Sequence, residues 1–162
     1  EMRMGVGGFG YAWAPISGEG IDESINNSKN LINKFLDQLV KLYGDEDTKL
    51  VLGGFSQGAM MALEVGLKRR DLICGIISCS GWIHASQTDN EPDSNNQQEI
   101  FIGHGSLDDI VPIQKSIEAM DKLSSIGYST QFREYDIAHE ISQIEISDIS
   151  EWLQSKTPPF DN

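Results

Sequence analysis

The residues best suited to chemistry form a Gly-x-Ser-x-Gly pattern made by Gly54, Ser56 and Gly58. The pattern follows a short apolar run, Leu50–Phe55, and precedes an amphipathic run that begins at Gln57. Where a strand ends abruptly and a helix begins, a serine on the turn is exposed as a nucleophile. We expect glycine on both sides because a side chain there would collide with the strand and the helix. The less specific alternative is an ordinary strand-to-helix turn that exposes a serine.

A serine hydroxyl becomes a good nucleophile only when a base accepts its proton and a third group orients that base. A later apolar strand is followed by Asp108 and Asp109, and the strand after it is followed by His139. Serine, acid and histidine in this chain order, each at a strand end, are typical of α/β-hydrolases. The order predicts Ser56 as nucleophile and His139 as base, and by itself leaves either aspartate as the acid.

Strands and helices alternate along the chain, which predicts a single α/β domain over residues 1–162 with a mostly parallel sheet covered by helices on both faces. The first helix should turn one apolar stripe inward, namely Ile21, Ile25, Ile32, Phe35, Leu39 and Tyr43. The predicted helices are Asp22–Tyr43, Gln57–Lys68, Pro112–Ile126 and Ile141–Leu153, and the predicted strands are Leu50–Phe55, Leu72–Cys79, Glu99–His104 and Ser129–Tyr135.

Residues 1–20 are rich in glycine and aromatic residues and are expected to form a loop. Gly5, Gly7 and Gly10 match a dinucleotide-binding pattern. That pattern requires a preceding strand and an immediately following helix, and Pro15 interrupts any such helix. Nucleotide binding is therefore a remote hypothesis, which a strand upstream of Glu1 would revive.

The composition limits the classes of partner. The 162 residues include 25 acidic and 12 basic side chains, a formal charge of −13, which disfavours nucleic acid and anionic membranes as partners. No apolar run is long enough to span a bilayer, so stable membrane insertion is not expected. Cys74 and Cys79 should lie on opposite faces of one strand as free thiols, which favours a reducing, cytoplasmic location. Neither cysteine nor the three scattered histidines has metal-ligand spacing.

Several motifs together resemble the phospholipase/carboxylesterase family of α/β-hydrolases, which includes bacterial carboxylesterases and acyl-protein thioesterases. The resemblance extends from about Trp13 to Leu153. It is carried by Gly54-Phe-Ser-Gln-Gly58, Ser80-Gly-Trp82, His104-Gly105, Asp108, Val111-Pro112 and His139.

The resemblance implies an α/β-hydrolase fold and a serine hydrolase of ester or thioester bonds that uses no cofactor or metal. It selects Asp108 as the acid, because the family's acid lies four residues after the histidine of the His-Gly pair and three before the valine. His104 would then shape the loop, and Asp109 would be a charge at the N-terminus of the next helix, where the helix macrodipole favours a carboxylate. The Gln57 N–H would stabilise the oxyanion. An apolar acyl pocket would be lined by Trp82, Met60, Ile110 and Val111, for each of which core packing is the alternative.

The resemblance also implies several strands and an oxyanion loop before Glu1, so the domain is expected to be N-terminally incomplete. One edge of the nucleophile strand would then be unpaired, a feature that favours homo-oligomers. The chain would be a fragment, or a partner would supply the strands, or activity would have been lost. The second hypothesis for function is accordingly a truncated, non-catalytic α/β module that associates with itself or a partner. The substrate, a short ester, a lysophospholipid or an acylated protein, stays open.

Overall fold

The computed structural model of the chain describes residues 2–4, 8–10, 12–15, 18–45, 47–84 and 98–156. From residue 21 onward, helices and strands alternate as the sequence predicts, and their boundaries lie within two residues of the predicted ones. The elements are β1 Met2–Met4, β2 Gly8–Gly10, α1 Ile21–Tyr43, β3 Leu50–Phe55, α2 Gln57–Gly66, β4 Ile73–Cys79, β5 Glu99–Gly105, α3 Gln114–Ser125, β6 Ser129–Tyr135 and α4 Gln143–Gln154.

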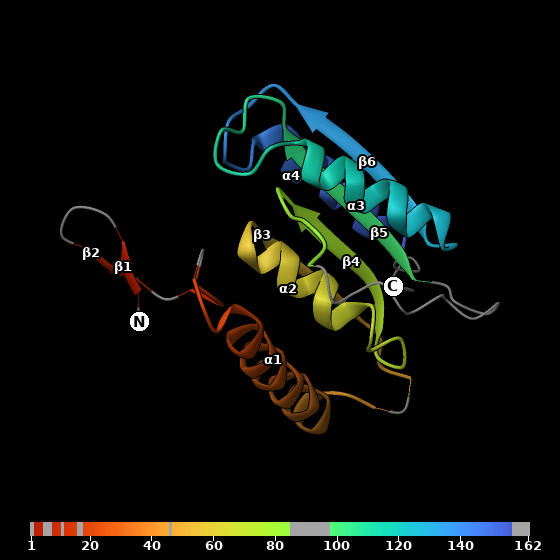
Figure 1. Ribbon diagram of the computed structural model, residues 1–162. Coiled ribbons are helices and arrows are strands. Elements are labelled where there is room, and N and C mark those ends of the chain that lie inside the picture. Colours follow the sequence, from red (N-terminus) through yellow and green to blue (C-terminus); the bar gives the residue numbers. More distant parts are fainter. Residues whose placement is uncertain are drawn as a thin grey trace.

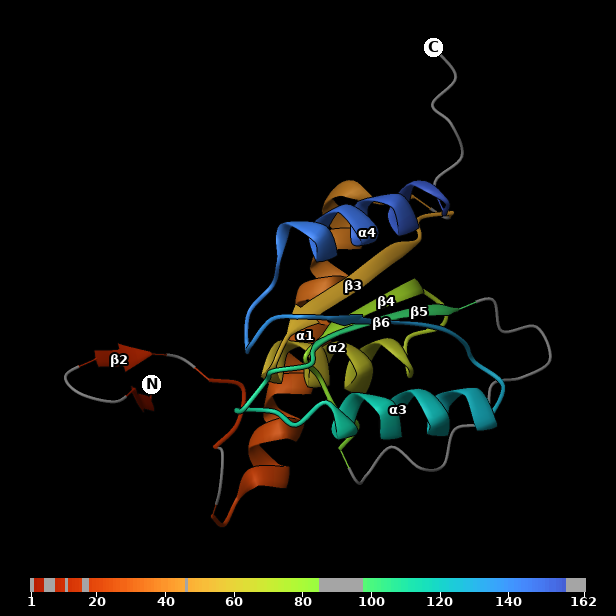
Figure 2. The ribbon, with the colours of Figure 1, turned by 90° about the horizontal axis from the view of Figure 1, so that it is seen from above.

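Strands β3 to β6 form one parallel sheet in the order β3-β4-β5-β6 (Figure 1). Helices α2 and α3 cover one face of this sheet, and α4 covers the other (Figure 2). Parallel strands end at the same edge of a sheet, where α/β proteins build their sites. The loops that carry the three predicted triad residues are therefore collected at one edge.

Helix α2 is buried almost all round, because it lies between the sheet and α1. Every residue from Ala59 to Gly66 is buried. The buried carboxylate of Glu64 receives a hydrogen bond from Lys29 of α1 at 3.2 Å, so the only charge in this stretch is paired across the two helices. The apolar core of this layer includes Leu36, Leu63, Ile73, Ile76, Ile100, Ile102 and Leu123.

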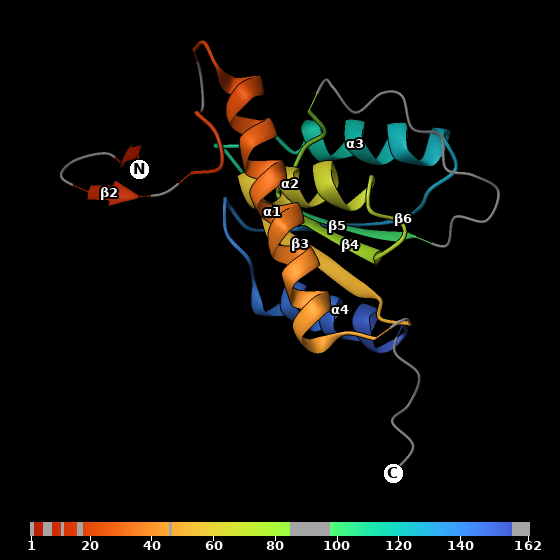
Figure 3. The same cartoon turned by 90° about the horizontal axis from the view of Figure 1, so that it is seen from below.

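The prediction for the inward face of α1 is partly wrong. Ile25 and Leu36 are buried, whereas Phe35 is 60% exposed and Tyr43 is 83% exposed. Figure 3 shows the reason: α1 runs past the β3 end of the sheet, from the side of α2 towards the side of α4, instead of lying along a face. A helix that crosses in this way buries a narrower stripe than its apolar pattern offers.

Within the described part of the chain, β3 pairs on one side only, with β4. The unpaired edge that the sequence predicts for the nucleophile strand is therefore present, and Gly53 in the middle of the strand is exposed.

The expectation of a loop through residues 1–20 is wrong for six residues. Strands β1 and β2 pair antiparallel, with Arg3 opposite Phe9, and form a sheet separate from the main one. Each of the two strands is only three residues long, which is too short to show the alternating pattern by which a strand is recognised in a sequence. Gly10 lies in β2 and the next helix begins only at Ile21, so the context needed for dinucleotide binding does not follow it.

Only one of the two glycines beside Ser56 is required by close packing. A Cβ at Gly54 would overlap the carbonyl group of Gly58 and lie 2.7 Å from the N atom of Ala59. A Cβ at Gly58 would meet nothing closer than the Trp13 indole nitrogen, at 3.8 Å. The predicted collision at Gly58 is therefore wrong. Gly54 at the end of β3 lies against the backbone of the first turn of α2, whereas a side chain at Gly58 would meet neither the strand nor the helix.

A matched pair of variants tests this asymmetry. Gly54→Ala should lower the free energy of unfolding by about 3 kcal/mol, because backbone atoms cannot move aside cheaply. Gly58→Ala should leave stability unchanged or raise it by roughly 0.5–1 kcal/mol, since alanine favours a helix over glycine. Denaturant unfolding measures both, and equal losses would contradict this packing.

Candidate active site

Ser56 occupies a strained backbone conformation between β3 and α2. Its φ of 55° and ψ of −121° are unusual for a residue with a side chain. The Ser56 N–H donates to the carbonyl oxygen of Cys79 at 2.9 Å, which ties the turn to the end of β4. The turn directs the serine hydroxyl towards the loops that follow β5 and β6.

The loop after β6 brings His139 to Ser56. The Nε2 atom of His139 lies 3.0 Å from the Ser56 Oγ atom, and its Nδ1 atom lies 2.7 Å from the Asp108 Oδ2 atom. The ring of Phe55 lies against the imidazole, with 4.6 Å between ring centroids. Three groups that are 31 to 83 residues apart in sequence therefore form one continuous hydrogen-bonded series.

Gly105 permits this approach at the end of β5. A Cβ at this position would overlap the carbonyl oxygens of Ile137 and Ala138 in the loop after β6, the histidine loop, which carries His139. The N–H of Leu107 in the loop after β5, the acid loop, which carries Asp108, donates to the Ile137 carbonyl at 3.0 Å. The two loops are therefore also joined through their backbones. The glycine of the His-Gly pair thus lets two loops pack in direct contact.

Asp108 is held as an acceptor from several directions. Its Oδ1 atom accepts from the N–H groups of Ile110 at 3.0 Å and Val111 at 2.8 Å, while Oδ2 faces His139. Burial favours a higher pKa for this carboxyl, but hydrogen bonds from His139, from the two N–H groups and from the Ser80 side chain outweigh burial and hold the pKa below its ordinary value. Asp108 is buried as an oriented carboxylate, whereas its neighbour Asp109 is exposed.

His104 supports the acid loop and does not contact Ser56. Its side chain is fully buried, with Nε2 donating to the carbonyl oxygen of Val111 at 2.8 Å and Nδ1 hydrogen-bonded to Ser116 Oγ at 2.7 Å. The Ser116 Oγ atom also lies 2.8 Å from the Gly81 carbonyl oxygen. These contacts agree with the predicted role of His104 in shaping the loop.

Gln57 has a role that the sequence did not suggest. Its side chain accepts from the N–H of Trp13 at 3.1 Å and donates to the carbonyl oxygen of Ala14 at 3.0 Å. The side chain therefore holds the segment before α1 over the start of α2. Gln57 is also the first residue of α2, and helix geometry leaves its N–H without an acceptor inside the helix. That N–H lies directly after the predicted nucleophile.

The four residues expected to line an acyl pocket differ in exposure. Met60 is 2% exposed and belongs to a cluster with Ala14, Ile25 and Met61, as the core-packing alternative expects. Val111 is also buried, and its backbone supports Asp108 and His104. Ile110 is 67% exposed beside Asp108. Ile110 and the partly buried Trp82 are the two that present surface to solvent.

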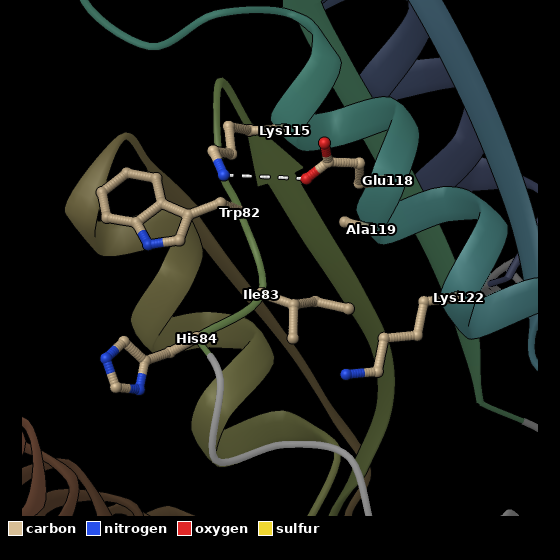
Figure 4. A pocket seen from close by; sticks show the side chains of 7 residues that line it. All are labelled: Trp82, Ile83, His84, Lys115, Glu118, Ala119 and Lys122. Carbon is tan, nitrogen blue, oxygen red and sulfur yellow. Dashed lines mark ion pairs between the residues drawn. The ribbon is translucent and has the colours of Figure 1, made fainter.

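Trp82 also lines a hollow of about 170 Å³ between the segment after β4 and one face of α3 (Figure 4). Lys115 and Glu118 form an ion pair at 3.7 Å on the helix side. The sequence did not predict this hollow, because its two walls lie far apart in the chain, with the strand β5 between them. Its lining consists of Trp82, Ile83, His84, Lys115, Glu118, Ala119 and Lys122.

Two other kinds of site are not found in the described ranges. No group of three or more His, Cys, Asp or Glu side chains among the described residues is arranged to hold a metal ion. No helix of the described chain is both long and apolar enough to cross a membrane. Cys74 and Cys79 are free thiols, and Cys79 is buried.

A parallel sheet with a serine at a strained strand-to-helix turn, followed by an acid loop and a histidine loop, defines an α/β-hydrolase fold. Solved structures share it. The crystal structure of esterase PE8 superposes with a TM-score of 0.76 at 28% identity, over 90% of this chain and 70% of that chain. Acyl-protein thioesterase 2 of Zea mays gives a TM-score of 0.73 at 22% identity, over 89% and 71%, and shows the fold alone.

The chain belongs to the phospholipase/carboxylesterase family, whose sequence model it matches over residues 6–157. It is 31% identical over 146 residues to acyl-protein thioesterase 1 of Gibberella zeae, which covers 87% of this chain and 60% of that protein. It is 27% identical over 140 residues to lysophospholipase-like protein 1 of Mus musculus, which covers 84% and 58%. The chain thus spans about three fifths of the length of these relatives.

The lowered pKa of Asp108 predicts a pH-dependent contribution to stability. Its folded-state pKa lies below the unfolded value of about 3.9, so the charged carboxylate stabilises the fold above that pH and the contribution is lost as pH falls through the folded-state pKa. The unfolding free energy of the native protein, relative to that of Asp108→Asn, should therefore decrease as pH falls from 5 to 2.5. Denaturant unfolding across this range measures the difference, and a difference that stays constant would contradict the account.

Proposed function

We propose that the chain is the catalytic part of a serine hydrolase that cleaves carboxylic ester or thioester bonds through an acyl-enzyme on Ser56. The observation that carries the proposal is the hydrogen-bonded series from Ser56 Oγ to His139 at 3.0 Å and from His139 to Asp108 at 2.7 Å. The same observation disfavours the truncated, non-catalytic module, because such a module has no need of this alignment.

The chemistry follows from the donors and acceptors. His139 Nε2 takes the hydroxyl proton as Ser56 Oγ attacks the acyl carbonyl, and Asp108 stabilises the imidazolium through Nδ1–H. The N–H of Gln57 donates to the oxyanion that forms. Collapse of this intermediate breaks the ester or thioester bond, and His139 returns its proton to the leaving alcohol or thiol. Water, activated by His139, then hydrolyses the acyl-enzyme to free acid. No step calls for a metal or a cofactor.

The substrate proposed is an acylated small molecule or protein. The names of the relatives, acyl-protein thioesterase and lysophospholipase-like protein, support this class. Within the chain, Ile110 and Trp82 offer apolar surface to an acyl group, and Trp82 packs against the buried cluster that contains Met60, while Val111 is buried next to Ile110 in the chain. The reducing environment suited to the two free thiols supports a cytoplasmic location, and the formal charge of −13 disfavours nucleic acid as a partner.

The open edge of β3 is proposed to join two copies of the chain. The N–H groups of Leu50 and Ser56 point towards β4, where they donate to the carbonyls of Leu72 and Cys79. With the two-residue period of a strand, the N–H groups of Val51 and Gly53 face the open side. Unpaired edge groups of this kind are ready to pair with another strand.

Activity measurements on active-site variants test the proposed chemistry. In the native protein, Asp108→Asn should lower kcat for a p-nitrophenyl ester or an acyl thioester by roughly a thousandfold or more, because the imidazole loses its orienting charge. Ser56→Ala should abolish the acyl-enzyme. Asp109→Asn is the matched control, since this adjacent carboxylate is exposed, and it should retain native kcat. Equal losses in the two asparagine variants would refute the assignment of the acid.

The proposed association has its own measurement. The mass in solution should rise with protein concentration from one copy to two, and hydrogen exchange at the amides of Val51 and Gly53 should slow in parallel because those N–H groups gain acceptors. Light scattering and exchange mass spectrometry follow the two effects. A mass of one copy at every concentration, with unchanged exchange at β3, would exclude the edge as an interface.

A further inference from the structure

Glu145 is a buried carboxyl that the proposed chemistry does not use. It lies in the first turn of α4, on the face of the sheet opposite α2 and α3 (Figure 2), and is 1% exposed. Its Oε1 atom has no hydrogen-bond partner. Burial raises the pKa of this carboxyl, and the nearby carboxylate of Asp148 raises it further. Hydrogen bonds from the Cys79 side chain and the Ser142 backbone oppose the rise. A buried, incompletely paired carboxyl destabilises a fold, so its presence calls for a reason.

The carboxyl of Glu145 touches the ends of two neighbouring strands. It is hydrogen-bonded to the thiol of Cys79 at the end of β4. It also packs against Gly103 of β5, where a Cβ would overlap its Oε1 atom. Cys79 and Gly103 are paired in the sheet register, so one carboxyl spans both strands at the same level.

These two strand ends hold the nucleophile and the acid. The carbonyl of Cys79 accepts from Ser56 N–H at 2.9 Å, and the carbonyl of Gly103 accepts from Ser80 N–H at 2.8 Å. Ser80 has a positive φ of 49°, and its side chain is hydrogen-bonded to Asp108. A displacement of Cys79 would therefore move the strained turn at Ser56 and the group that supports Asp108 together.

The third segment of the site is joined to Glu145 through the chain itself. His139 lies six residues before Glu145, and the short connection ends at Ser142, whose hydroxyl accepts from Glu145 N–H at 3.1 Å. The cap fixes the start of α4, and the buried side chain one turn later fixes that start against the sheet. Glu145 thus contacts, directly or through one neighbour, the segments that carry all three groups.

The other titratable groups around Glu145 come from β4, β6 and α4. Burial and the adjacent carboxyl of Glu145 raise the pKa of the Cys79 thiol, which keeps it a neutral donor. Burial and Asp148 also raise the pKa of Tyr135, whose hydroxyl donates to Asp148 at 2.9 Å. The Cys79 thiol therefore donates to Glu145, whereas the Tyr135 hydroxyl is engaged by Asp148.

We propose that Glu145 is a positioning residue, which sets the separation of Ser56, Asp108 and His139 by fixing the ends of β4 and β5 against the start of α4. The inference rests on the proposed hydrolase function. It assigns to Glu145 no contact with substrate: its effect passes through Cys79, Gly103 and the His139 loop.

The test compares Glu145→Gln with Glu151→Gln, an exposed glutamate on the same helix. Active sites are first counted by titration with a fluorophosphonate, so that kcat is expressed per reactive site. Glu145→Gln should keep or raise the melting temperature, because a neutral amide is easier to bury than a carboxylate. Its kcat per site should fall tenfold or more, with KM within twofold of native. Glu151→Gln should match the native protein in all three quantities.

A purely structural role gives a different result. It would lower the melting temperature and the number of reactive sites while leaving kcat per site at the native value, and this outcome overturns the proposal. Should Glu145→Gln fail to fold, Cys79→Ala removes the other partner of the same hydrogen bond and should lower kcat per site at least threefold. A folded Cys79→Ala protein with native kcat overturns the proposal as well. Failure of the native protein to turn over any ester or thioester would instead refute the hydrolase function, so the two failures are distinguishable.

Discussion

The conformation of Ser56 is the constraint on which the rest of the structure depends. A residue with a side chain at φ 55° and ψ −121° is strained and needs surrounding contacts to hold it. The hydrogen bond to the Cys79 carbonyl, the closely packed Gly54 and the buried helix α2 provide them. Relaxation of this turn would point the hydroxyl away from His139, so the sheet and helix packing around it matter for chemistry as much as for stability.

The site is assembled from the ends of parallel strands, and close backbone approaches make that assembly possible. Gly105 lets the histidine loop lie on the acid loop, and Gly103 leaves room for Glu145 beneath the same strand. His104 and Ser116 then fix the acid loop to the segment after β4. Each group of the hydrogen-bonded series is thus held by a neighbour from another strand, which preorganises the site before any substrate arrives.

Much of this arrangement could be predicted from sequence, because strands that alternate with helices indicate a parallel sheet, whose strand ends place Ser56, Asp108 and His139 at one edge. Other features depend on packing that a linear pattern does not contain. The exposure of Phe35 arises from the direction in which α1 crosses the sheet. The open space for a side chain at Gly58 depends on the angle between β3 and α2. Glu145 looks like an ordinary acidic residue of a helix's first turn, and only its three-dimensional neighbours distinguish it.

The central claim is that Ser56 is an activated nucleophile, and covalent labelling tests it most directly. The native protein containing this chain would be treated with a fluorophosphonate, and the modified residue located by peptide mass spectrometry. The account predicts a single adduct on Ser56, and no adduct in a Ser56→Ala variant. A folded native protein that remains unlabelled at Ser56, or that is labelled equally in the Ser56→Ala variant, would contradict it.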